Sequence, residues 1–154
     1  MGRMYSKSGA QSSKTGRLNY INPSDYPQIV FFTGAGMSAE SGIPTYRGAG
    51  GIWEEYNWDE LACEEAAQND PQKVLEFHEI RWEKALTCTP HAGYEVISYL
   101  QRNHNNVAII TQNIDGMHQL SRNTNVIELH GRIWRLCCLY DRVVINDRGR
   151  KYKN

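Results

Sequence analysis

A glycine-rich segment after residue 33 carries the first residues whose types and spacing could do chemistry. Gly34, Gly36 and Ala39 satisfy the pattern G-x-G-x-x-(G/A), and the run QIVFF, residues 28–32, precedes them. In a dinucleotide-binding turn the first glycine allows a tight bend, the second lets a diphosphate approach the backbone, and the small third residue lets a helix pack on a strand. The alternative for the pattern taken alone is a tight turn that binds no ligand.

The acidic residue that ordinary dinucleotide dehydrogenases place about 20 positions later is missing. Glu54 and Glu55 stand near this spacing, but they follow a GAGG loop and a tryptophan instead of a second strand. The sequence therefore disfavours an ordinary NAD dehydrogenase.

The segment 71–86, PQKVLEFHEIRWEKAL, places an imidazole and a guanidinium on the apolar side of a predicted helix. At about 100° per residue, Val74, His78, Arg81 and Ala85 share one narrow stripe opposite three glutamates. Burial of such groups without partners is unfavourable, so His78 and Arg81 should line a cavity or meet an anion. The alternative is that Arg81 pairs with an internal carboxylate and that His78 is a hydrogen-bonded core residue.

Two further motifs follow predicted strands, TQNID at 111–115 and ELHG at 128–131. Together with GAGMSAESGIPTYR at 34–47, they resemble the sirtuin family of NAD-dependent protein deacylases in order and spacing. The resemblance runs from about residue 28 to 138. It implies an α/β fold with a Rossmann-like parallel sheet, and NAD in a cleft beside a smaller zinc-bearing domain. It also implies removal of acyl groups from lysines of protein substrates, with release of nicotinamide and O-acyl-ADP-ribose.

The same resemblance implies which residues act. His130 would be the general base on a ribose hydroxyl, a role that a neutral imidazole performs well at cellular pH. Asn113 and Asp115 would take part in catalysis by fixing the nicotinamide and its ribose, and helix capping is the alternative for this pair. Tyr46 departs from the family, which usually has phenylalanine there. The implied NAD-binding residues are Gly34, Ala35, Gly36, Ser38, Glu40, Pro44, Tyr46, Arg47, Trp53, Gln112, Asn113, Ile114 and Asp115.

Acyl recognition is the second role that the resemblance implies. The segment RGAGGIW, residues 47–53, is typical of the sirtuin branch that prefers acidic acyl groups, and this branch carries a TyrxxArg pair. Arg81 matches the arginine, whereas His78 stands in the place of the tyrosine. Both are the implied substrate-binding residues, and deacetylase and desuccinylase types both stay open.

The cysteines do not match the family's zinc module, which usually has two CxxC pairs. Cys137 adjoins Cys138, and Tyr140 and Asp141 occupy the positions where the second cysteine of a pair would stand. Adjacent cysteines alone cannot complete a closed tetrahedral site, so zinc is expected from the family but no metal ligand is assigned.

The elements that must position these residues alternate along the chain. Continuous β-branched and aromatic runs predict strands at 28–32, 107–111 and 126–130 that are buried on both faces of a parallel sheet. Helices are predicted from Asp70–Pro71 and from Thr89–Pro90. A short β-like run at 142–145 begins a hairpin or a loop. We expect a disordered tail over 1–24, the NAD-binding domain over 25–136, and the incomplete start of the small module over 137–154.

Composition sets the outer limits. With 154 residues, 40% hydrophobic, and 17 basic against 17 acidic side chains, the chain is expected to form one folded domain. No run approaches the roughly 18 apolar residues of a membrane span, and no secretory signal is evident. Basic residues lie mostly in the polar ends, which disfavours nucleic-acid partners. An intracellular location is expected, cytoplasmic first, with mitochondrial or nuclear location left open.

The family's later strands have no counterpart after Asn154, so we expect the amino-terminal part of a sirtuin catalytic domain. The function expected is NAD-dependent protein-lysine deacylation. The alternatives are a truncated, catalytically inactive protein that binds NAD or a partner, and a mono-ADP-ribosyltransferase.

Overall fold

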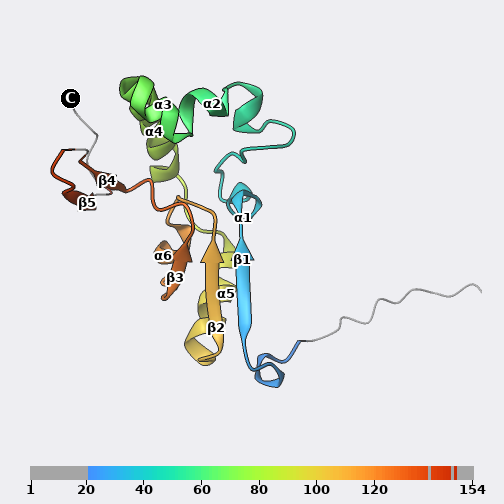
Figure 1. Cartoon of the computed structure of the whole chain (residues 1–154). Helices are drawn as coiled ribbons and strands as arrows, with labels where there is room; N and C mark the ends of the chain where they lie inside the picture. The colour runs from blue at the N-terminus through green and yellow to red at the C-terminus, as the bar shows by residue number, and fades with distance from the viewer. Residues whose placement is uncertain (1–20, 139, 147, 149–154) are drawn as a thin grey trace, which may run out of the picture.

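Three parallel strands form the centre of the computed structural model, which describes residues 21–138, 140–146 and 148 (Figure 1). Their order in the sheet is β1 (Ile29–Thr33), β2 (Val107–Thr111) and β3 (Val126–Glu128). Parallel neighbours need long crossover connections, and the whole segment 34–106 serves as the crossover between β1 and β2. The predicted α/β class with a parallel sheet is confirmed.

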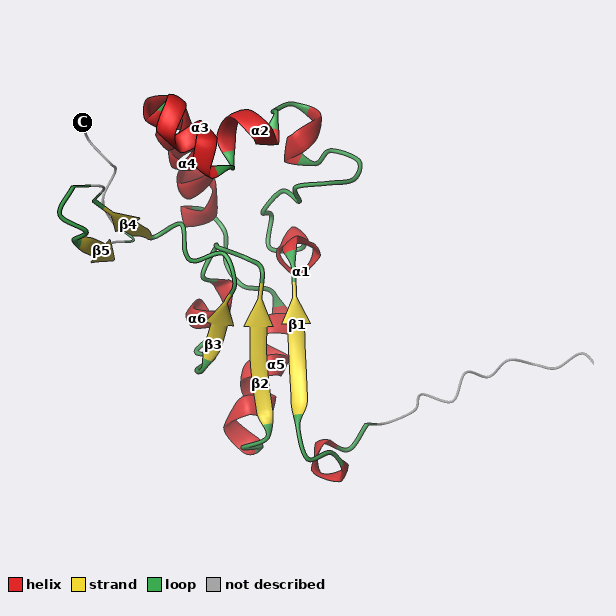
Figure 2. Cartoon of the chain, in the orientation of Figure 1, coloured by secondary structure: helices red, strands yellow, loops and turns green. Residues whose placement is uncertain are grey.

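The helices of the described residues fall into two groups (Figure 2). One group packs against β2 and consists of α5 (Ala92–Asn103) with the short α6 (Met117–Leu120) beside it. The other lies beyond the carboxyl ends of the strands, where its three helices contact one another: α2 (Trp58–Leu61), α3 (Glu64–Asn69) and α4 (Pro71–Leu86). The remaining turns are α1 (Ala35–Ala39), which follows β1, and the 3-10 turns η1 (Pro23–Asp25) and η2 (Ile52–Glu54).

The two long helices begin for recognisable reasons. The Asp70 side chain accepts a hydrogen bond from the Lys73 amide at 3.0 Å, and Pro71 occupies the first turn of α4, as predicted. Helix α5 starts later than the Thr89–Pro90 signal suggests. The backbone is still extended at His91, so this residue is the N-cap and the helix begins after it. The His91 Nδ1 atom accepts a hydrogen bond from the Gly93 amide at 3.0 Å.

Two buried clusters join helices to one another and to the segment that follows β3. Trp82 and Ala85 of α4 pack with Ile133 and Trp134, which follow β3. Cys88, Tyr94 and Met117 form the second cluster, and the partly buried Ile43 contacts both. The segment after α1 is therefore attached to both helix groups.

The prediction that the strands are buried on both faces is wrong for β1 and β3. Val30 and Phe32 of β1 are 50% and 62% exposed, and Ile127 of β3 is 55% exposed. Alternate side chains of a strand point to opposite faces, and among the described residues α5 covers only one of them. Strand β3 also ends at Glu128, two residues before the predicted end.

The last described residues form an antiparallel hairpin of β4 (Arg135–Cys137) and β5 (Val144–Asn146), so the β-like run predicted at 142–145 belongs to a hairpin. Of the predicted tail 1–24, residues 1–20 lie outside the described residues. Its described end includes Pro23, whose carbonyl accepts a hydrogen bond from the Asn106 side chain at 3.1 Å. No helix within the described ranges is both long and apolar enough to cross a membrane.

Candidate functional site

A cavity of about 950 Å³ lies where the three strands of the sheet end. The glycine loop enters it from β1, the TQNID segment from β2 and His130 from β3, while residues of α2 and α4 line another part of it. Most of the residues predicted to bind NAD or substrate line it. Those lining residues are Gly34, Ala35, Gly36, Tyr46, Arg47, Trp53, His78, Gln112, Asn113, Ile114 and His130.

The glycines of the loop leave open space in this cavity. A Cβ added to Gly36 would meet no atom within 4 Å, and one added to Gly34 would lie 3.8 Å from the Gln112 side chain. Packing within the described chain therefore does not require glycine at either position. A group that approaches the backbone from the cavity would require it.

Asn113 and Asp115 lie beneath the cavity and are buried. The Nδ2 group of Asn113 donates to the Gly34 carbonyl at 2.9 Å and to Ser38 Oγ at 3.0 Å. Ser38 Oγ donates to Asp115 at 2.6 Å, and the other Asp115 oxygen accepts from the Met117 amide at 2.9 Å. Asp115 thus accepts from the first amide of α6, although the N-cap position itself is Gly116, and it also joins a polar network under the glycine loop.

His130 is exposed on the turn that follows β3. The turn is anchored because the Leu129 amide donates to the Thr111 carbonyl at 2.9 Å, and Gly131 continues it at a φ of 72° that favours glycine. An exposed imidazole on an anchored turn can exchange a proton with a ligand in the cavity.

His78 also faces this cavity, from α4. Its Nδ1 lies 2.8 Å from the Val74 carbonyl, which only accepts, so Nδ1 carries the proton and Nε2 is the acceptor in the neutral ring. Burial lowers the pKa of His78, and the nearby Arg81 charge adds to the decrease. The imidazole is therefore neutral at cellular pH.

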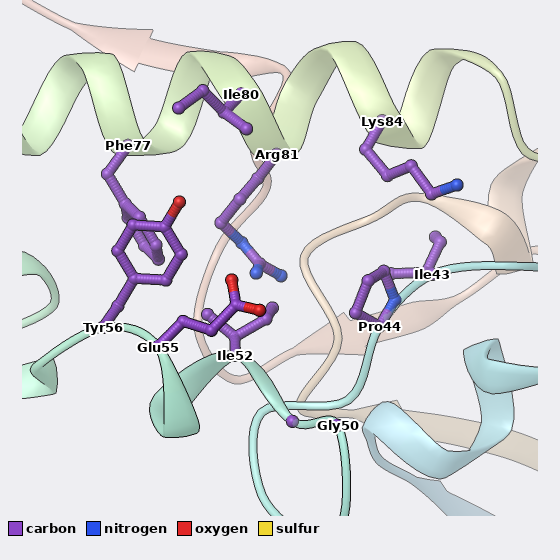
Figure 3. A pocket seen from close by; sticks show the side chains of 11 residues that line it. Ile43, Pro44, Gly50, Ile52, Glu55, Tyr56, Phe77, Ile80, Arg81 and Lys84 are labelled. Carbon is purple, nitrogen blue, oxygen red and sulfur yellow. The ribbon is translucent and has the colours of Figure 1, made fainter.

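Arg81 faces a second, smaller cavity of about 250 Å³, so the two predicted substrate-binding residues do not share one cavity (Figure 3). This cavity is lined by apolar residues that include Pro44, Ile52 and Phe77, and also by the charged Glu55 and Lys84. Figure 3 shows the Arg81 side chain directed from α4 toward Ile52. Arg81 Cζ lies 4.4 Å from the ring centroid of Tyr46, and its buried Nε has no hydrogen-bond acceptor among the described residues. The predicted alternative of an internal carboxylate partner is not what the geometry shows.

Besides Asp115, three predicted NAD-binding residues do not line the larger cavity. Ser38 is fully buried under the glycine loop, and Pro44 lines the smaller cavity. The Glu40 side chain is largely exposed and lies 3.7 Å from the His91 ring nitrogen. The remaining lining residues include Val74, which the sequence places on the same helix stripe as His78. Sequence reasoning missed the others, four of which lie in or next to α2, a helix too short to show a helical period: Thr45, Trp58, Leu61, Ala62 and Cys63.

The side chains present do not fit a zinc site. Within residues 21–138, 140–146 and 148, no group of three or more His, Cys, Asp or Glu side chains could hold a metal ion. Cys137 and Cys138 are both free thiols.

Comparison with known proteins identifies the chain's relatives. The Sir2 family model matches residues 34–151. An NAD-dependent protein deacylase 1 of Caldanaerobacter subterraneus is 45% identical over 109 residues, which cover 71% of this chain and 45% of the relative. An NAD-dependent protein deacylase of Pyrococcus furiosus is 46% identical over 109 residues, which cover 71% of this chain and 44% of the relative. The chain spans about half the length of the curated relatives it matches.

Solved structures show the same fold. A mutant Sir2 homologue in complex with ADP ribose superposes with a TM-score of 0.73 at 36% identity, covering 77% of this chain and 48% of that one. A Sir2 homologue–NAD complex superposes with a TM-score of 0.69 at 36% identity, covering 77% of this chain and 47% of that one. The matched family model, the sequence identity and the shared Rossmann-like sheet agree, and the chain belongs to the Sir2 family.

Proposed function

We propose that this chain binds NAD in the larger cavity and acts in NAD-dependent removal of acyl groups from protein lysines. The observation that carries the proposal is that His130 faces the same cavity as the glycine loop. Relatives named NAD-dependent protein deacylases and a neighbour solved as an NAD complex support it. Acylated lysines of protein substrates are the proposed partners.

The cavity fits such a ligand. Its volume of about 950 Å³ lies in the range of cofactor sites, and the open space beside Gly36 admits a diphosphate close to the backbone. Arg47 lines the same cavity and can supply positive charge to the phosphates. When bound, NAD supplies a ribose carbon that loses nicotinamide and takes up the acyl oxygen.

The chain's own residues would orient the ligand and move a proton. Both Nδ2 protons of Asn113 are donated inside the protein, so this side chain offers only its Oδ1 acceptor to a ligand donor such as a carboxamide or a hydroxyl. His130, at the exposed rim, would take the proton of a ribose hydroxyl through a ring nitrogen.

We further propose that the acyl groups accepted include acidic ones, with Arg81 as their partner. The support is the buried Arg81 Nε, which has no acceptor among the described residues and which a carboxylate would satisfy. A carboxylate reaching Arg81 must compete with the Tyr46 ring for the guanidinium. Turnover of succinyl-lysine and acetyl-lysine peptides tests this: Arg81→Met should lower succinyl turnover selectively, and a clear acetyl preference of the unaltered chain would refute it.

Calorimetric titration with NAD tests the principal proposal. We expect micromolar binding, and Gly36→Ala should weaken it by about tenfold or more because the added Cβ enters the cavity. The unfolding free energy of this variant should hold or rise by about 0.4–1 kcal/mol, since alanine restricts the unfolded chain. Tyr99→Phe, an exposed change on α5 outside the cavity, is the control. Absence of binding by the folded chain would favour the inactive alternative.

Intact-mass spectrometry separates the two catalytic outcomes. After incubation with NAD and an acylated peptide, loss of the acyl mass from the peptide supports deacylation. Gain of an ADP-ribose mass on protein or peptide would instead favour the ADP-ribosyltransferase.

A further inference from the structure

Tyr94 in the first turn of α5 lies directly behind the candidate NAD cavity. Its side chain is completely buried, and it does not line the cavity. Its hydroxyl oxygen lies 2.7 Å from Ser38 Oγ, and Ser38 in turn contacts both Asn113 and Asp115. The buried Tyr94 hydroxyl is therefore part of the hydrogen-bond network that Ser38 forms with Asn113 and Asp115.

Counting protons fixes the direction of each hydrogen bond. The Ser38 hydroxyl has one proton, which it donates to the Asp115 carboxylate at 2.6 Å. Its two lone pairs then accept from Asn113 Nδ2 at 3.0 Å and from the Tyr94 hydroxyl at 2.7 Å. Every hydrogen-bonding position of Ser38 is used, so Tyr94 must be the donor.

The Tyr94 donor also stays protonated. Burial is the main reason that the pKa of Tyr94 rises to about 12, so the phenol keeps its proton near neutral pH. The two hydrogen bonds from Tyr94 to Ser38 and from Ser38 to Asp115 therefore have one donor-to-acceptor direction.

We propose that Tyr94 is a positioning residue, whose hydroxyl fixes Ser38 and through it holds the Asp115 carboxylate and the Asn113 amide in place at the cavity floor. Tyr94 itself touches no ligand in this arrangement. The importance of this position for NAD rests on the proposed function, whereas its effect on Ser38 and Asn113 does not.

Two ligands test the consequence for binding. Asn113 and Asp115 are proposed to hold the nicotinamide and its ribose, so Tyr94→Phe should weaken NAD about tenfold while ADP-ribose changes less than about twofold. A merely structural role would weaken both ligands equally. Tyr99→Phe removes a hydroxyl from an exposed tyrosine of the same helix and should leave both affinities unchanged.

A double-mutant cycle shows whether Tyr94 acts through Ser38. The effects of Tyr94→Phe and Ser38→Ala on NAD affinity should be strongly non-additive, because either change breaks the same chain of hydrogen bonds. Additive effects, or equal weakening of NAD and ADP-ribose, would overturn the proposal.

A ligand-free measurement keeps the proposal testable if NAD does not bind, an outcome that would count against the proposed function alone. In ¹⁵N NMR spectra of the free chain, Tyr94→Phe should shift the side-chain amide resonances of Asn113, and Tyr99→Phe should not. An unmoved Asn113 amide would overturn the positioning role whether or not NAD binds.

Discussion

The guanidinium of Arg81 lies over the ring of Tyr46, with Cζ 4.4 Å from the ring centroid. Tyr46 meets Trp53 at a centroid distance of 5.3 Å, and Trp53 stacks on Phe77 of α4 at 5.7 Å. The loop that follows α1 is therefore fastened to α4 at two points, by a cation over one ring and by a stacked ring pair. Because Tyr46 and Trp53 both line the larger cavity, these contacts hold part of its wall against α4.

Arg81→Lys tests the contribution of this stack. Lysine keeps the positive charge but lacks the planar group that packs on a ring, so we expect the free energy of unfolding to fall by about 0.5–2 kcal/mol. Urea denaturation provides the measurement. Arg102→Lys on the exposed side of α5 is the matched control and should stay within about 0.5 kcal/mol of the parent chain.

Two histidines that are shielded from water predict that stability falls as the solution becomes acidic. Burial lowers the pKa of His118, although the Asp115 charge opposes this decrease. Burial and the Arg81 charge lower the pKa of His78, against the hydrogen bond to the Val74 carbonyl. Above the unfolded pKa near 6.5, both histidines are neutral in both states and stability is constant. Below it the unfolded chain binds protons that the folded chain does not, so stability decreases as pH falls.

The slope of the unfolding free energy against pH gives a quantitative check. Each histidine contributes at most about 1.4 kcal/mol per pH unit, so urea denaturation between about pH 7.5 and 5.5 should approach the uptake of two protons on unfolding. His78→Gln should reduce that uptake by about one proton. A stability that does not change over this range would contradict the neutral state of both rings.

Gly51 is required by close backbone packing. A Cβ at this residue would lie 2.9 Å from three backbone atoms of the preceding turn, belonging to Tyr46, Arg47 and Gly48. Gly51→Ala should therefore lower the unfolding free energy by about 1–3 kcal/mol, as overpacking does. Gly36→Ala provides the comparison, because its Cβ meets open space. Equal destabilisation of the two variants would count against the packing explanation.

Trp134 ties the segment after β3 to the cavity floor. Its Nε1 donates to the Asp115 carbonyl at 2.9 Å, and its ring lies 6.0 Å from that of Trp82. Trp134→Phe keeps an aromatic ring but leaves the Asp115 carbonyl without its donor. The free energy of unfolding should therefore fall by about 1–3 kcal/mol, as measured by urea denaturation followed by circular dichroism. Trp58→Phe, at a tryptophan that is 54% exposed, should change stability by less than about 0.5 kcal/mol.

Local sequence signals predicted the elements well where one short-range effect dominates. The Asp70–Pro71 start of α4 and the positions of β1 and β2 follow from capping and from continuous β-branched runs. Burial of a sheet face is different, because it depends on what packs there. Val30 and Phe32 were therefore predicted to be buried although they are exposed.

The cavity was predictable only in part, for a similar reason. Turn glycines and strand-end polar residues carry strong signals, and these lead to Gly36, Asn113 and His130. The helical spacing of His78 and Arg81 does not predict that they line different cavities. Their separation depends on tertiary packing, in which the Tyr46 ring lies against Arg81. Tyr94 reads as an ordinary helix residue in the sequence, and only the approach of α5 to α1 places its hydroxyl on Ser38.

The hydroxyl groups of Thr33 and Thr111 form a hydrogen bond at 2.9 Å across 78 positions of sequence, at the end of the parallel pairing between β1 and β2. Closing so long a loop costs chain entropy before the strand contacts can offset it, so this pairing slows folding. During synthesis β1 emerges first and has no parallel neighbour until residues 107–111 leave the ribosome. For that interval the apolar side chains of Val30 and Phe32 belong to an unpaired strand, whose open edge favours association with other chains.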